Sequence, residues 1–152
     1  MKLAVVGVTG EVGRMMVRVL QERNVRPKKV AFYASARSAG STMAFNGEEH
    51  EVRELTRKVM KEGYDYVLFS AGASVSREYA PVAAEAGSVV IDNSSAFRMD
   101  GDVPLVVPEI NGDLLKGYRR GIVANPNCST IQMVLGLYGV HKRFGIRSIV
   151  VS

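Results

Sequence analysis

Residues 2–13 read KLAVVGVTGEVG, a short apolar run that leads into glycines at positions 7, 10 and 13. The run predicts a buried β-strand, and the apolar residues that recur at three- and four-residue intervals after it predict a helix up to about residue 24. Residues 29–33, KVAFY, predict a second strand. This order of strand, helix and strand predicts a β-α-β unit, whose two strands lie parallel in one sheet.

The same alternation continues along the chain. Apolar runs predict further strands at 64–69, 88–92, 122–125 and 146–151, and helical spacing follows at 74–86 and around 131–138. Between these elements, Asn46-Gly47 marks a hairpin within residues 42–53. The predicted fold class is therefore α/β, a doubly wound and mainly parallel sheet of the Rossmann-like type.

Composition narrows the class of protein. The chain has 152 residues, of which 47% are hydrophobic and 23% charged, which suits roughly one globular domain. The net charge of +5 comes from scattered basic residues rather than a basic stripe with aromatics, so we expect a general preference for anions and no nucleic-acid partner. Neither a signal peptide nor a long apolar span is present, so we expect a cytoplasmic protein without a membrane partner.

The glycine-rich turn predicts a phosphate site. Between a strand and a helix, small residues let the backbone approach a pyrophosphate, and the first N–H groups of the helix donate to it. The candidate cofactor-binding residues here are Gly7, Thr9, Gly10, Glu11, Val12 and Gly13. The alternative is a tight turn that packs the helix on the sheet and binds nothing.

The end of the second strand favours NADP over NAD. An acid there would repel a ribose 2′-phosphate, but Ser35, Arg37 and Ser38 stand in that region and could bind the phosphate by charge-assisted hydrogen bonds. Arg37 could instead be a solvated loop residue. The turn Ser70-Ala71-Gly72 follows another strand and is also predicted to line the cofactor site, although it fits a plain turn equally well.

Cys128, the only cysteine, is a candidate nucleophile because it lies where a strand passes into a helix. The field at a helix N-terminus favours the thiolate, and Asn127 can cap the helix or donate its amide to an oxyanion. A thiol beside a nicotinamide implies acyl transfer to sulfur followed by hydride transfer. The alternative is an inert cysteine of the core.

Three motifs together resemble the bacterial aspartate-semialdehyde dehydrogenase family: residues 7–13, residues 35–40 (SARSAG) and residues 125–130 (NPNCST). The resemblance implies NADPH-dependent reduction of L-aspartyl 4-phosphate to L-aspartate 4-semialdehyde, a step toward lysine, methionine and threonine, with the acyl phosphate and semialdehyde as small-molecule partners. Cys128 would accept the acyl group and Asn127 would stabilise the oxyanion. The resemblance also implies that Arg98 binds the substrate phosphate, that Asn93 lies near it or near the nicotinamide, and that no metal takes part.

The family pattern also includes a glutamine, an arginine and a histidine beyond the last residue of this sequence. We therefore divide the chain into an NADP-binding domain, 1–127, and a nucleophile helix and first strand, 128–152, that lead into an absent catalytic and dimerisation domain. The chain alone is expected to be inactive, and the full enzyme to be a homodimer or homotetramer. His50 and His141 do not match the family histidine.

Two other functions stay open at this point. N-acetylglutamyl-phosphate reductase shares the domain order and the cysteine chemistry. A non-catalytic NADP-binding or redox-sensing module would leave Cys128 oxidised or idle.

Overall fold

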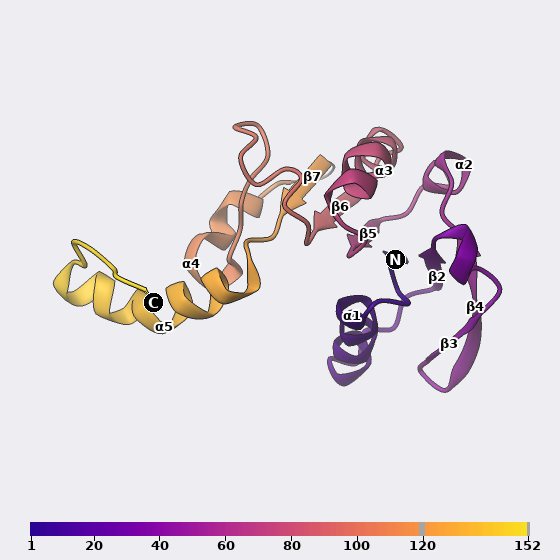
Figure 1. Cartoon of the computed structure of the whole chain (residues 1–152), viewed down its shortest axis with the longest axis horizontal. Coiled ribbons are helices and arrows are strands. Elements are labelled where there is room, and N and C mark those ends of the chain that lie inside the picture. Colours follow the sequence, from indigo (N-terminus) through magenta and orange to yellow (C-terminus); the bar gives the residue numbers. More distant parts are fainter. Residues whose placement is uncertain (119–120, 152) are drawn as a thin grey trace.

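The computed structural model describes residues 1–118 and 121–151 and contains a seven-stranded sheet in the order β3-β4-β2-β1-β5-β6-β7 (Figure 1). All neighbouring strands are parallel except the β3–β4 pair. This arrangement confirms the predicted doubly wound, mainly parallel fold. The strands are β1 Lys2–Val6, β2 Lys29–Ala34, β3 Thr42–Phe45, β4 Glu48–Glu54, β5 Tyr66–Phe69, β6 Val89–Asp92 and β7 Gly121–Ala124.

Helices cover both faces of the sheet, α1 on one side and α3 on the other (Figure 1). Alternate residues of β1 serve the two faces: Val5 packs with Val17 of α1, whereas Ala4 and Val6 lie in the core that contains Ala80 of α3. The helices are α1 Glu11–Glu22, α2 Arg57–Met60, α3 Ala73–Glu85, α4 Pro108–Asn111 and α5 Cys128–Phe144, with short 3-10 helices η1 Ala36–Ser38 and η2 Gly112–Leu115.

The predicted hairpin joins β3 and β4. Asn46 and Gly47 both have positive φ, 53° and 86°, as a tight two-residue hairpin turn requires. The backbone N–H of Asn46 donates to the side chain of Gln21 (2.9 Å), and its side-chain amide donates to the carbonyl of Val25 (3.2 Å). The hairpin is therefore tied to α1, and it returns β4 parallel to β2.

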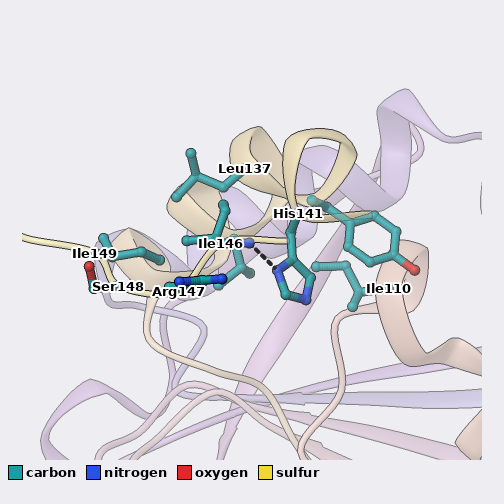
Figure 2. A pocket seen from close by; sticks show the side chains of 9 residues that line it. Ile110, Leu137, His141, Ile146, Arg147, Ser148 and Ile149 are labelled. Carbon is teal, nitrogen blue, oxygen red and sulfur yellow. Dashed lines mark hydrogen bonds between the residues drawn. The ribbon is translucent and has the colours of Figure 1, made fainter. Parts of the chain in front are cut away.

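The predicted strand at residues 146–151 is wrong. These residues form no strand, and they fold back beside α5, where the backbone N–H of Ile146 donates to His141 Nδ1 (3.1 Å; Figure 2). An extended segment becomes a strand only when a neighbour completes its hydrogen bonds, and this segment follows α5 instead of a sheet edge. Ser152, the last residue of the region 128–152, lies outside the described residues.

Helix α5 extends away from the sheet (Figure 1), and none of its residues is buried. Within residues 1–118 and 121–151, no helix has the length and apolar character needed to span a membrane.

A polar network joins β2 and β4 to the segment between α2 and β5. Arg53 of β4 donates to Glu62 Oε1 (2.9 Å) and to the hydroxyl of Tyr33 (3.2 Å), and Tyr64 donates to Glu62 Oε2 (3.1 Å). The hydrogen bond from Arg53 lowers the pKa of Glu62 from its ordinary value of 4.5. The ionised carboxylate is thus the form that stabilises the fold.

Replacing Glu62 with Gln should remove this pH-dependent part of the stability. Because the pKa is lower in the folded state, the stabilisation is complete above about pH 4.5 and is lost as pH falls through the folded-state pKa. Urea unfolding between about pH 6 and 3 should show a smaller acid-side loss of unfolding free energy in Glu62→Gln than in the wild type. Parallel pH curves for the two proteins would contradict this role.

Candidate functional site

Two glycines of the loop after β1 allow backbones to approach closely. Gly7 has a φ of 81°, and a Cβ there would overlap the carbonyl of Ser70 at the end of β5. A Cβ on Gly13, in the first turn of α1, would overlap the carbonyl of Gly7. The loop is therefore held between α1 and β5 only because both residues lack a side chain.

Gly10 has a different role, because a Cβ there would come no closer than 3.5 Å to another residue. It is the N-cap of α1 and supplies no side-chain cap, and the side chain of Arg14 donates back to the Thr9 carbonyl (3.2 Å). The first N–H groups of α1 are thus not capped by the residue before the helix. Such a helix end binds an anion such as a pyrophosphate.

A cleft of about 540 Å³ opens beside this loop, at the carboxyl ends of β1, β2, β4 and β5. The predicted cofactor residues that line it are Gly7, Thr9, Gly10, Ser35, Ser70 and Ala71. Other predicted residues do not line its wall, namely Glu11, Val12, Gly13, Arg37, Ser38 and Gly72. Of these, Arg37 lies exposed on η1, directly after the wall residues Ser35 and Ala36.

Sequence reasoning missed the two acids that line this cleft, Glu54 and Glu78. Glu54 ends β4, and its partner in the register of the sheet is Ala34 at the end of β2. The second strand carries no acid at its end, but the hairpin brings one to the neighbouring strand. The only sequence indication of this placement was the hairpin signal at Asn46-Gly47, because the hairpin returns the chain as β4, which pairs in parallel with β2.

Tyr79 of α3 also lines the cleft and was not predicted. Burial, together with the negative charge of Glu78, raises the pKa of the Tyr79 phenol, so the side chain is a neutral hydroxyl at physiological pH. Leu55 and Val75 add apolar surface to the wall, and the Glu78 carboxylate lines it beside the Tyr79 hydroxyl.

A second group of residues lies farther along the same sheet edge, where β6 ends. Asp92 is fully buried, and it accepts hydrogen bonds from the hydroxyls of Ser76 and Ser94 (2.7 Å each) and from the Ser94 backbone N–H (3.2 Å). Since Ser76 belongs to α3, the carboxylate joins that helix to the loop after β6. This loop carries the predicted substrate residues Asn93 and Arg98.

The Arg98 guanidinium is held by backbone carbonyls. Its Nε donates to the Asn125 carbonyl (2.9 Å), and its Nη2 donates to the Asn93 carbonyl (3.1 Å). No carboxylate of the described residues forms an ion pair with it. The ends of β6 and β7 therefore present a positive charge that is fixed in place and not neutralised there.

Cys128 is exposed at the first residue of α5, so it is not a cysteine of the core. Asn127 caps this helix, because its side-chain oxygen accepts from the N–H groups of Ser129 (3.0 Å) and Thr130 (3.4 Å). Its amide nitrogen makes no hydrogen bond within the described part of the chain. The thiol follows β7, which lies three strands from β1, roughly 14 Å at the usual strand spacing.

A second cavity, also about 540 Å³, lies between α5 and residues 146–149 (Figure 2). It is lined mainly by apolar side chains, and His141 accepts the hydrogen bond from Ile146 beside it. None of the predicted site residues lines this cavity. The chemistry-bearing residues gather instead at the carboxyl edge of the sheet.

Residues 2–118 match a protein family described as semialdehyde dehydrogenase, NAD binding domain. The chain is 52% identical over 152 residues to an aspartate-semialdehyde dehydrogenase of Aquifex aeolicus. The aligned region covers 99% of this chain and 45% of that protein. A relative of the same name in Bacillus subtilis is 48% identical, with 43% of its length covered. The chain thus spans less than half the length of these curated relatives.

Solved structures of aspartate-semialdehyde dehydrogenases also resemble this chain over about half of their own length. The structure of aspartate-semialdehyde dehydrogenase II from Vibrio cholerae complexed with ASA is 46% identical, with a TM-score of 0.89 over 95% of this chain and 47% of that one. The Candida albicans aspartate semialdehyde dehydrogenase with NADP is 27% identical, with a TM-score of 0.74 over 95% of this chain and 48% of that one.

The glycine packing predicts a strong difference between two alanine substitutions. Gly13→Ala should lower the unfolding free energy by about 1–3 kcal/mol, because its Cβ overlaps the Gly7 carbonyl and α1 must shift. Gly10→Ala is the matched control and should cost less than about 1 kcal/mol, since its Cβ makes only an ordinary van der Waals contact at an N-cap. Urea unfolding of the two variants tests this, and equal losses would exclude the packing role.

Proposed function

We propose a function from one premise: the chain belongs to the semialdehyde dehydrogenase family, whose NAD-binding domain matches residues 2–118. On this premise, the chain forms the NADP-binding and acyl-accepting part of an aspartate-semialdehyde dehydrogenase. The observation that carries the proposal is the exposed Cys128 at the start of α5, on the same sheet edge as the glycine loop. The Arg98 guanidinium, which forms no ion pair with a carboxylate of the described residues, lies along this edge at the ends of β6 and β7.

The cofactor of the proposal is NADP. Its pyrophosphate fits the loop because Gly7 and Gly13 leave the backbone bare and the first turn of α1 has no side-chain cap. Ser35, Arg37 and Ser38 follow β2, where they suit the ribose 2′-phosphate. When bound, reduced NADP supplies a hydride. The NADP in the Candida albicans relative supports this choice.

The residues at β6, β7 and α5 suit an acyl phosphate. The Cys128 thiolate attacks the acyl carbon of L-aspartyl 4-phosphate, a C–S bond forms, the bond between the acyl carbon and the bridging phosphate oxygen breaks, and phosphate leaves beside Arg98. Hydride addition to the thioester carbon then gives a thiohemiacetal oxyanion. The Asn127 amide and the Cys128 N–H are the donors for this oxygen. Its collapse breaks the C–S bond and releases L-aspartate 4-semialdehyde and the thiolate.

We propose that neither histidine of this sequence is the general acid or base. The sequence has two histidines, and His50 lies on β4 toward the hairpin end. His141 is 13 residues after Cys128 on α5, roughly 20 Å along the helix. We therefore expect this chain to accept an acyl group but not to turn over at the rate of an intact enzyme. The homodimer or homotetramer that the resemblance implies stays a prediction, as does the cytoplasmic location.

The division of the chain follows from the same roles. We propose that residues 1–127 bind NADP and that 128–152 begin the catalytic part, because the nucleophile starts a helix that leaves the sheet.

The proposal predicts acylation of one residue. Incubation of the chain with L-aspartyl 4-phosphate should form a thioester at Cys128, detected by mass spectrometry and removed by hydroxylamine. Cys128→Ser is the control that should give no hydroxylamine-labile adduct. N-acetylglutamyl 5-phosphate should acylate Cys128 much more slowly.

Three outcomes would contradict this assignment. An unmodified Cys128 would favour the non-catalytic module, and faster acylation by the N-acetylglutamyl compound would favour the other reductase. Turnover by the isolated chain at a rate typical of intact enzymes would show that no further acid or base is needed.

The cofactor assignment predicts a selective loss. Arg37→Ala should weaken NADPH binding by roughly ten-fold to a hundred-fold, the cost of a lost charged hydrogen bond, with little effect on NADH. Arg26→Ala is the control, because Arg26 is also exposed but precedes β2 at the opposite edge of the sheet. Calorimetric titration of both cofactors measures the ratio. An equal loss for NADPH and NADH in Arg37→Ala would exclude a 2′-phosphate contact.

A further inference from the structure

We propose that Asn125 is a positioning residue: its side chain sets the amide of Asn93 so that the N–H groups of Asn93 and Arg98 face one site for an acceptor-only anion of the phosphate class. The inference rests on the proposed function for the identity of this anion as the phosphate of the substrate. The geometry itself comes from the ends of β6 and β7.

The two asparagines occupy equivalent places on neighbouring strands. Asn93 is the first residue after β6, and Asn125 is the first after β7. Their backbone N–H groups continue the sheet ladder, from Asn93 to the Phe69 carbonyl (3.0 Å) and from Asn125 to the Asp92 carbonyl (2.8 Å). Both backbones are therefore fixed as firmly as the strands, and buried Asp92 holds the loop that follows Asn93.

The side chains of these residues form a directional pair. Asn125 Nδ2 donates to Asn93 Oδ1 at 2.6 Å. An asparagine amide has its oxygen on one side and its NH₂ group on the other. Because the oxygen of Asn93 is occupied by Asn125, its NH₂ group points the other way, as a donor. Asn125 thereby determines which half of the Asn93 amide is available to a ligand.

Arg98 adds its charge at the same place. The carbonyl groups of the same two asparagines hold its Nε and Nη2, which leaves the remaining guanidinium N–H groups for a ligand. The available side-chain groups of Asn93 and Arg98 are therefore donors, with the acceptors turned inward. A donor-only surface of this kind suits a phosphate oxygen, which accepts hydrogen bonds and carries negative charge.

Two substitutions of Asn125 separate orientation from mere packing. Asn125→Asp keeps the shape but replaces the donor with a carboxylate, which would repel Asn93 Oδ1 and attract its NH₂. The Asn93 amide should then turn over, and the site loses a donor and gains a negative charge near Arg98. Asn125→Ala removes the constraint without the reversal, so its effect should be smaller.

The experiment uses the 152-residue chain and inorganic phosphate as the probe. Phosphate binding is measured by titration, and the side-chain amides of Asn93 and Asn125 are followed by ¹⁵N–¹H NMR. We expect Asn125→Asp to weaken phosphate binding by roughly ten-fold to a hundred-fold and Asn125→Ala by less than that, in the range of a lost hydrogen bond to a charged group. Asn24→Asp, the same charge change at an exposed turn residue, should leave binding unchanged.

The NMR signals give a readout that a structural role would not move. The Asn125 amide should be protected from exchange, and the Asn93 amide should be accessible and shift when phosphate is added. The proposal is overturned if the Asn93 amide is the protected one, if Asn125→Asp binds phosphate like the wild type, or if the wild type binds no phosphate. Titration of wild-type chain with NADPH tests the proposed function separately, because it can succeed or fail whatever the phosphate result.

Discussion

The candidate site depends on one steric constraint, the contact between the glycine loop and its two neighbours. The carbonyl of Gly7 occupies the space that a side chain at Gly13 would need, and the carbonyl of Ser70 occupies the space that one at Gly7 would need. The loop after β1 and the first turn of α1 therefore meet the end of β5, which is distant in sequence, backbone to backbone. Under the proposed function, the same bare backbone would also be the surface that a pyrophosphate approaches, so one feature would determine both stability and cofactor binding.

The parallel arrangement of the strands extends the candidate site beyond this local contact. Since they all end at one edge, residues after β1, β2, β4 and β5 line the cleft, and residues after β6 and β7 form the fixed positive rim. Buried Asp92 connects the rim to α3, so the loop that carries Asn93 and Arg98 is not free to move. The cleft and the Arg98 charge therefore lie along the same edge of the sheet.

The sequence predicted the parts of the molecule that local patterns determine. The apolar runs located the buried strands, the spaced glycines located the loop, and Asn46-Gly47 located the hairpin, because each pattern acts within a few residues. The predicted strand at 146–151 was wrong for the opposite reason: β-propensity there is strong, but a strand also needs a partner, which no local pattern reveals.

The missed site residues have the same explanation. Glu54 faces the cleft only because the hairpin places β4 next to β2, and Asn125 matters only because β7 lies beside β6. Their roles depend on which strands become neighbours. By contrast, the cap of α5 by Asn127 could be predicted, since a cap and its helix are adjacent in the chain.

Helix α5 is anchored at its first turn but is not buried along its length. Its first residue follows a strand that is part of the sheet, and Asn127 caps it, yet none of its 17 residues is buried. Most helical stability in proteins comes from an apolar face that is covered, and the described residues cover α5 only in part, through Ile110 and residues 146–149. The exposed thiol of Cys128 therefore lies where a segment anchored in the sheet passes into a helix whose stability would rise if a further apolar surface covered it.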